Sequence, residues 1–271
     1  MARRLSDGRL HLQHGPIDLV ILGTELEYER AELRFRTVLE ELVAELPLLR
    51  APLGAAYPLV RGPVARRMVA AVWPHRAVFV TPMAAVAGAV ADEVLEAMQP
   101  VGKAYVNDGG DIAVHLPPGE TFEAGIVNNP LKPALDAQLR LDESCGIATS
   151  GWRGRSQSLG IADAVTVVAR NAAEADAAAT LIANAVNAAH PAIVRRPARE
   201  VKEDSDLGEL PVTVDVGPLP PRTVREALAA GVRVARGMRA RGLIRAAYLA
   251  LQKQTMSVVP EVHFPSQRRS P

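Results

Sequence analysis

Apolar and polar residues follow each other in two different rhythms, which predict a mixture of helices and strands. Residues 29–46 carry apolar side chains at helical spacing with Glu and Arg between them, and Pro47 follows. This pattern indicates an amphipathic helix. A further helix is expected at 222–241, where arginines separate the apolar positions.

Two more helices are expected to be rich in alanine. Residues 83–99 follow Thr81, which is suited to an N-cap, and residues 172–189 follow Asn171, which is suited to the same role. Gly88 lies inside the first of these helices, where glycine costs about 1 kcal/mol relative to alanine. We therefore expect the two helices to pack closely against a sheet, with another backbone or a ligand near Gly88.

Short runs of alternating or β-branched residues predict strands. The first three are expected to form a meander whose first turn is Asp108-Gly109-Gly110. A final strand is expected within 243–252. The predicted strands before it are 103–107, 111–116, 122–127, 137–141, 146–149 and 164–169.

Strand clusters and long helices without a regular βαβ alternation favour an α+β fold with mixed or antiparallel sheets. No internal repeat is visible in the sequence. We expect one domain over residues 1–271, in which 192–221 is a polar surface excursion and 262–271 a flexible tail.

The composition argues against nucleic-acid-binding, membrane-bound and disulfide-stabilised proteins. The 271 residues are 48% hydrophobic and 23% charged, with a net charge of +1, so nothing global favours nucleic acid or an anionic membrane. We expect neither as a partner, because aromatic residues for stacking are few and the C-terminal arginines fit a solvated helix surface. No export signal or membrane segment is recognisable, and the single Cys145 excludes an intramolecular disulfide. A cytoplasmic location is expected. Whether the protein forms a homo-oligomer is an open question at this stage.

Two turns of small residues are the candidate ligand site. The first comprises Asn107, Asp108, Gly109, Gly110 and Asp111, whose backbone amides could hold phosphate or carboxylate oxygens. A simple hairpin turn explains the same residues equally well.

The second turn comprises Thr149, Ser150 and Gly151, with Arg153 and Arg155 just after them. Hydroxyls, glycines and arginines together suit an anion-binding loop. A solvent loop between strands is the alternative.

Asp176 and Thr180 lie four residues apart on one face of an expected helix. Two oxygen donors at this spacing could help to bind Mg²⁺, whereas a solvated helix face is the default interpretation. The six histidines are scattered, so no catalytic residue is assigned.

Five segments in this order resemble the ApbE superfamily, the FAD-dependent protein flavin transferases once described as thiamine-biosynthesis lipoproteins. They cover roughly residues 80–185. The segments are AVAGAVAD, KAYVNDGGDIAV, FEAGIVNNP, GIATSG and AVTVVARNAAEADAAAT, which resemble the family's IAKGYAVD, ALVNxGGDI, WxVGIxDP, AVATSG and SVTVVAPxAxxADALAT.

The resemblance implies a T-fold-like architecture and a cytoplasmic branch of the superfamily. It also implies that the VNDGGD and ATSG segments help to bind FAD, and that Asp176 and Thr180 take part in binding Mg²⁺. Three departures matter: Ala87 replaces the family's lysine, the lipoprotein signal is missing, and RGRSQSLGIAD replaces the HxIDPxTG block. Asp163 is a candidate remnant of that block.

Three hypotheses about function follow. The protein binds a flavin or related nucleotide with Mg²⁺ and transfers or hydrolyses it, or it is a non-catalytic metabolite-binding or accessory protein that has lost the transfer loop. An enzyme that acts on another small metabolite in the same cleft is the third.

Overall fold

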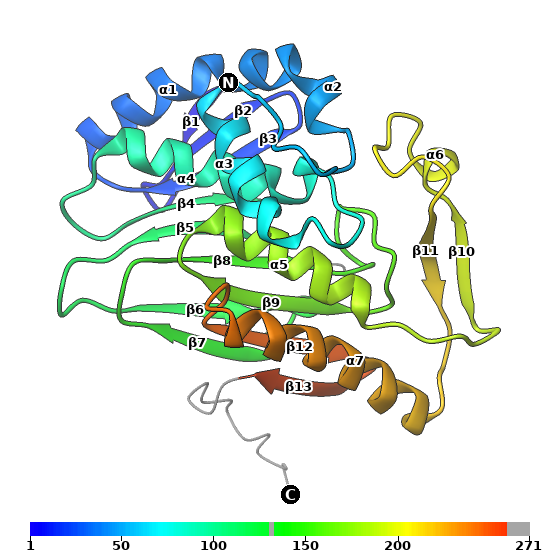
Figure 1. Cartoon of the computed structure of the whole chain (residues 1–271). Coiled ribbons are helices and arrows are strands. Elements are labelled where there is room, and N and C mark those ends of the chain that lie inside the picture. Colours follow the sequence, from blue (N-terminus) through cyan, green and yellow to red (C-terminus); the bar gives the residue numbers. More distant parts are fainter. Residues whose placement is uncertain (130–132, 259–271) are drawn as a thin grey trace, which may run out of the picture.

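A nine-stranded antiparallel sheet forms the centre of the computed structural model, which describes residues 1–129 and 133–258 (Figure 1). The strands lie side by side in the order β1-β2-β3-β4-β5-β8-β9-β12-β13, and all neighbours are antiparallel. Their bounds are β1 Ala2–Arg4, β2 Leu10–His14, β3 Ile17–Leu22, β4 Ala104–Asp108, β5 Asp111–His115, β8 Cys145–Ser150, β9 Ala164–Ala169, β12 Ala246–Leu251 and β13 Gln254–Val258.

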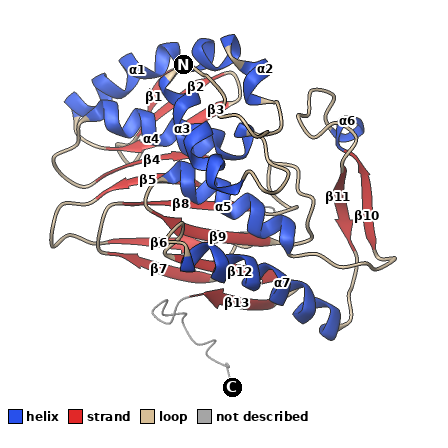
Figure 2. Ribbon diagram, viewed as in Figure 1, coloured by secondary structure: helices blue, strands red, loops and turns tan. Residues whose placement is uncertain are grey.

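Most of the helices cover one face of this sheet, whereas one short helix lies apart from it beside a separate hairpin (Figure 2). Together with the antiparallel sheets, they confirm the predicted α+β class. The main core lies between the helices and the sheet. The α-helices of the described part of the chain are α1 Glu25–Ala44, α2 Leu46–Leu49, α3 Pro63–Val72, α4 Val86–Met98, α5 Ala172–Ala185, α6 Ala198–Val201 and α7 Pro221–Ala240, with 3-10 turns at Trp73–His75 and Pro82–Ala85. None of these helices is long and apolar enough to cross a membrane.

The same succession of elements occurs twice within the large sheet. The strands β2, β3, β4 and β5 are neighbours in that order, with α1 and α4 between β3 and β4 in the chain. The strands β8, β9, β12 and β13 repeat this arrangement, with α5 and α7 between β9 and β12. Apart from α2, α3 and two 3-10 turns in the first half and β10, α6 and β11 in the second, both halves follow the order ββααββ, although no repeat is visible in the sequence. The two units meet where β5 pairs with β8 and where α4 packs on α5.

Several predicted elements need correction. The strands β1, β2, β3 and β13 are absent from the prediction, so 243–252 does not contain the final strand. The sequence of β3, IDLVIL, is apolar at five of six positions, so its strand pattern was present in the sequence and was overlooked. The tail expected at 262–271 lies outside the described residues.

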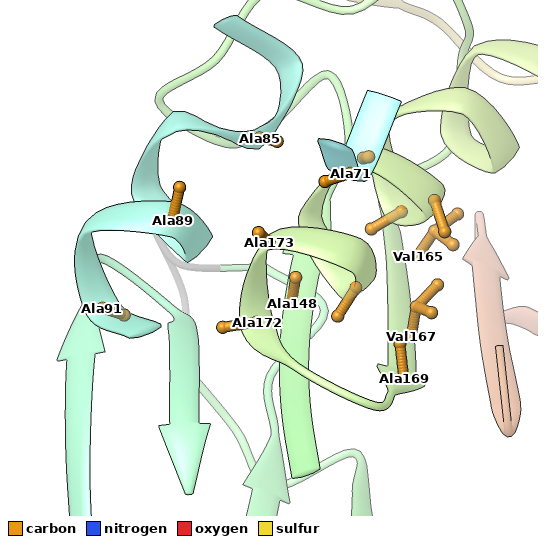
Figure 3. Packing of buried hydrophobic residues seen from close by; sticks show 14 of the residues in the cluster. Ala71, Ala85, Ala89, Ala91, Ala148, Val165, Val167, Ala169, Ala172 and Ala173 are labelled. Atoms are coloured by element: carbon orange, nitrogen blue, oxygen red, sulfur yellow. The ribbon is translucent and has the colours of Figure 1, made fainter. Parts of the chain in front are cut away.

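The helices α4 and α5 pack against each other at Gly88, as the glycine inside the first of them suggests. Figure 3 shows the buried alanines of this region, with Ala89 on α4 and Ala172 and Ala173 at the start of α5. A Cβ atom at Gly88 would overlap the carbonyl group of Ala172 and lie 2.7 Å from Ala173 N. Ala89 and Ala173 are buried in the same region. Small side chains thus allow the two helix backbones to approach each other closely.

Each of these two helices carries an aspartate that accepts hydrogen bonds from the first turn of the other. Asp92 on α4 accepts from Ala172 N at 2.9 Å and from Ala173 N at 2.8 Å. Asp176 on α5 accepts from Gly88 N at 3.1 Å. Burial raises the pKa of Asp92 to about 6, although its two backbone hydrogen bonds oppose this shift.

We expect Asp92→Ala to destabilise the protein by about 2 to 3 kcal/mol, because two buried N–H groups at the start of α5 lose their acceptor. Asp92→Asn keeps one acceptor oxygen and should cost about half as much. Urea unfolding at pH 8 measures both changes. Equal stability of the wild type and Asp92→Ala would contradict this role.

A hairpin of β6 (Phe122–Ile126) and β7 (Ala137–Leu141) packs on the other face of the sheet. Leu139 and Leu141 join Ile147 and Val168 in a second, smaller core there. The predicted meander is therefore wrong at its third strand: β5 pairs with β8, and β6 pairs only with β7.

The expected excursion at 192–221 contains a separate hairpin. β10 (Ile193–Pro197) pairs with β11 (Pro211–Val216), and α6 lies between them in the chain. Figure 1 shows this hairpin as an arm beside the main body. Its connecting segment contacts the body through the side chains of Asp204 and Asp206, which accept hydrogen bonds from Arg50 and Thr81.

Candidate functional site

Asp108 and Asp111 face each other across the Gly109-Gly110 turn between β4 and β5. The two glycines have φ angles of 63° and 115°, a region that favours glycine. Gly110 N donates to Asn107 Oδ1 at 2.8 Å. The hairpin interpretation is therefore correct for this segment, and Asn107 helps to form the turn.

Asp111 connects this turn to the second predicted segment. Thr149 N donates to Asp111 Oδ1 at 3.2 Å, and Thr149 Oγ1 lies 2.8 Å from Thr166 Oγ1 on β9. Ser150 and Gly151 follow directly and line the same cavity as the glycine turn. Pairing of β5 with β8 thus brings the two small-residue segments together.

Asp176 and Thr180 both face a cavity that Asp111 also lines. The first turn of α4 fixes the orientation of Asp176 through Gly88 N. The structure therefore places these two side chains at a shared internal surface with the glycine turn, and not on an open helix face.

Two cavities meet at this place. The helix cavity, about 250 Å³, lies between α5, residues 79–87 and residues 202–207. The sheet cavity, about 460 Å³, lies between the β4–β5 turn, residues 124–128 and residues 149–151. Four residues line both cavities: Ala87, Asp111, Arg155 and Ser156.

The carboxylates at this junction are poorly compensated. Burial raises the pKa of Asp108 and of Asp111 to about 7, and the charge of Asp108 adds to the shift of Asp111. Burial also raises the pKa of Asp176 well above its ordinary value, with Asp111 as the next cause. The charge of Arg155 lowers the pKa of Asp108 and Asp111, but does not cancel the effect of burial. The negative charge of these carboxylates would therefore attract a cation to the junction of the two cavities.

The described residues contain no group of three or more His, Cys, Asp or Glu side chains arranged to hold a metal ion. Asp111, Asp176 and Thr180 nevertheless offer two carboxylates and a hydroxyl to one cavity. Mg²⁺ prefers oxygen ligands and often takes the rest of its shell from water and from phosphate groups. The donor set therefore suits a cation that arrives with a phosphate ligand.

Arg153 is held away from both cavities. Its Nε donates to Asp163 Oδ1 at 2.7 Å, and its guanidinium stacks 4.4 Å from the centre of the Trp152 ring. Asp163 Oδ2 also accepts from Gln252 N at 2.6 Å. Both oxygens of this candidate remnant of the HxIDPxTG block are therefore engaged.

Residues 202–207 were expected at an open surface, but they form one wall of the helix cavity. Thr81 Oγ1 donates to Asp206 at 2.5 Å, and Arg50 donates to Asp204 at 2.9 Å. Thr81 therefore uses its hydroxyl for this contact and makes no side-chain cap. The acidic character of 202–207 was visible in the sequence, but its contact with Thr81 spans 125 positions and carries no local signal.

A family model described as "AbpE bacteria" matches residues 2–258. The chain belongs to this family. Its name agrees with the ApbE-like resemblance of the five sequence segments.

Similar proteins carry the name UPF0280 protein. The one from Methanothrix thermoacetophila is 39% identical over 160 residues, which cover 56% of this chain and 65% of the relative. The one from Methanopyrus kandleri is 36% identical over 50% of this chain and 56% of the relative. The one from Methanothermobacter thermautotrophicus is 33% identical over 66% of each. The chain thus spans between about half and two thirds of the length of these relatives.

All five ApbE-like segments contribute residues to the walls of the two cavities. Ala87 stands on the wall of both cavities, where the resemblance implies a lysine. Asp92, further along the same segment, serves α5 as a cap. In this chain, the ApbE-like segments therefore contain residues that join α4 to α5 and residues that face the cavities.

Proposed function

We propose that this ApbE-like protein binds a flavin or a related nucleotide together with Mg²⁺, and that it transfers or hydrolyses the nucleotide. One observation carries the proposal: Asp111 and Asp176, far apart in sequence, share a cavity in which each has a raised pKa. Such an arrangement of carboxylates is typical of functional sites more than of structural ones.

The duplicated ββααββ unit supports a T-fold-like architecture as part of the same proposal. In this arrangement the ligand site lies between the two units, where α4 crosses α5 and β5 pairs with β8. Clefts between structural units are common ligand sites.

The residues at the junction fit a nucleotide diphosphate. Bare backbone at Gly109 and Gly110 allows close approach, and Arg155 offers a guanidinium beside it. The sheet cavity has apolar walls at Ile112, Ile126 and Ile147, which suit a flat ring. The phosphate groups would then lie near Asp111, between the two cavities.

The carboxylates of Asp111 and Asp176 and the hydroxyl of Thr180 would hold the Mg²⁺ ion. When bound, the ion supplies positive charge that stabilises negative charge developing on a phosphate oxygen. Thr149 N and Gly88 N keep the two carboxylates in place through their hydrogen bonds. The chain's own contribution is thus to orient the oxygen ligands and to exclude water around them.

A non-catalytic binding protein is the second candidate, and the state of Asp163 favours it. This side chain lines the sheet cavity but accepts hydrogen bonds from Arg153, Trp152 and Gln252 N, so the protein itself already uses both of its oxygens. Loss of the HxIDPxTG block would then leave binding without transfer.

Titration with FAD and with ADP, each with and without Mg²⁺, tests the proposal. Mg²⁺-dependent binding of FAD with release of AMP in product chromatography supports transfer or hydrolysis. Stoichiometric binding without any product supports the second candidate. The absence of binding to either nucleotide with Mg²⁺ would overturn both.

Asp176→Asn should weaken Mg²⁺-dependent nucleotide binding at least about tenfold, since it removes one anionic oxygen ligand and a tenfold change is about 1.4 kcal/mol. The amide still accepts from Gly88 N, so the fold should be kept. Calorimetric titration measures the affinity. Asp142→Asn, at an exposed position outside both cavities, is the matched control. Equal affinities of the two variants would refute the metal-ligand role.

A further inference from the structure

Arg155 occupies a position that the ApbE-like motifs do not account for. It belongs to the RGRSQSLGIAD segment, which replaces the HxIDPxTG block. A Cβ atom at Gly109 would lie 2.7 Å from Arg155 Cζ, so the guanidinium rests directly on the glycine turn. The absence of a side chain at Gly109 is what makes room for it.

Arg155 is also the cation that lines both cavities. Among the described residues, Arg50 and Lys202 are the other basic side chains on these walls, and both line the helix cavity alone. Arg50 is paired with Asp204 at 2.9 Å, and Lys202 Nζ lies 3.9 Å from the same carboxylate. These two charges therefore serve the hairpin segment, whereas Arg155 stands at the junction.

The contacts of Arg155 leave it available to a ligand. Its nearest acidic atom is Asp108 Oδ1 at 3.9 Å, and 67% of its side chain is exposed. An ion pair at that distance and exposure contributes at most about 1 kcal/mol. A phosphate group can accept two parallel hydrogen bonds from one guanidinium, which is a much better partner.

We propose that Arg155 is an anion clamp: it binds the phosphate of the ligand at the junction of the two cavities, and in the ligand-free protein it acts as a counter-ion to the carboxylates there. The proposal rests on the proposed function, because it assigns the phosphate-binding role to one residue of that site. It makes Arg155, in place of the missing block, the determinant of selectivity for phosphorylated ligands.

This dual role has an unusual consequence. Arg155 lies 3.9 Å from Asp108 Oδ1 and lines both cavities together with Asp111, so its positive charge opposes a second cation beside these carboxylates. Removing the charge should therefore strengthen the binding of Mg²⁺ alone, while it weakens the binding of phosphate. A residue that merely supports the loop would weaken both.

The experiment compares Arg155→Gln and Arg155→Lys with the wild type by calorimetric titration. The probes are Mg²⁺ alone, then inorganic pyrophosphate in saturating Mg²⁺. Arg155→Gln should bind pyrophosphate at least about tenfold more weakly, because a charge-assisted bidentate contact is lost. The same variant should bind Mg²⁺ alone about two- to fivefold more tightly. Arg155→Lys keeps the charge, so its Mg²⁺ affinity should equal that of the wild type and its pyrophosphate affinity should be intermediate.

Two further variants sharpen the comparison. Arg36→Gln, at an arginine of similar exposure on α1, should change neither affinity. Loss of pyrophosphate binding in Arg153→Gln but not in Arg155→Gln would overturn the assignment. So would an equal loss of both affinities in Arg155→Gln.

The result also separates this inference from the proposed function. If the wild type binds pyrophosphate with Mg²⁺ and Arg155→Gln binds it equally well, only the clamp is wrong. If the wild type binds neither pyrophosphate nor ADP with Mg²⁺, the nucleotide site and the clamp both fail.

Discussion

Gly88→Ala is expected to destabilise the protein by about 3 kcal/mol or more, although alanine is the better helix former. The new Cβ atom would overlap the Ala172 carbonyl group and lie 2.7 Å from Ala173 N. Backbone atoms at a helix N-terminus cannot move aside as a side chain can. Relief therefore requires that α4 and α5 separate, which exposes their alanine-lined contact and displaces Asp92 and Asp176 from the helix termini they serve. Urea unfolding measures the change.

Gly237→Ala provides the matched control. Gly237 also lies inside a helix, α7, but a Cβ atom there meets nothing within 4 Å. This variant should stabilise the protein by about 0.5 to 1 kcal/mol, the ordinary gain from glycine to alanine in a helix. Opposite signs for the two variants are expected. A gain in stability for Gly88→Ala would show that α4 and α5 are not in close contact.

The stability of the ligand-free protein should fall as the pH rises, and Asp111 should account for a large part of the fall. Burial raises its pKa from 3.8 to about 7. The folded state therefore holds the proton more tightly than the unfolded state. The stabilisation is fully present below pH 3.8 and is lost as the pH rises through about 7. Between pH 5 and 8.5 one such group accounts for on the order of 2 to 3 kcal/mol.

Asp111→Asn isolates this contribution from other titrating groups. The amide oxygen can still accept from Thr149 N, but it has no charge at high pH. Thermal unfolding from pH 5 to 8.5 should show a shallower decrease for the variant than for the wild type. Mg²⁺ should stabilise the wild type mainly at pH 8.5, where the carboxylates are ionised. Parallel pH profiles of the two proteins would contradict the raised pKa of Asp111.

Local patterns predicted a large part of the secondary structure. Asn171 was expected to cap a helix, and its Oδ1 accepts from Glu174 N at 2.8 Å. The glycine turn was visible because Asp-Gly sequences favour tight hairpins through local backbone conformation alone. The strands near the N-terminus were missed although β1, β2 and β3 pair with one another over short distances along the chain. Only the pairing of β3 with β4 spans more than 80 residues.

The repeated arrangement of strands and helices could not be predicted from the sequence. The sequence contains no visible repeat, yet the four strands of each half have the same order in the large sheet, with two of the sheet-covering helices between the second and third strands. Binary patterns specify that elements pack on a sheet, and many side chains satisfy the same pattern. Strand order is therefore preserved where sequence similarity is not.

The features of the candidate site likewise fall into two groups, those set by local sequence and those set by the tertiary structure. The sequence by itself determined the α+β class, the glycine turn, and the spacing of Asp176 and Thr180 on one helix face, because each depends on residues within a few positions of one another. Gly88 indicated a close approach, but only the tertiary structure showed that its partner is the start of α5. Only the tertiary structure decided that Asp111 shares a cavity with Asp176, that Arg155 and not Arg153 lies there, and that residues 202–207 form its wall. These outcomes depend on strand pairing and helix crossing between distant segments, for which burial of the common core supplies the free energy.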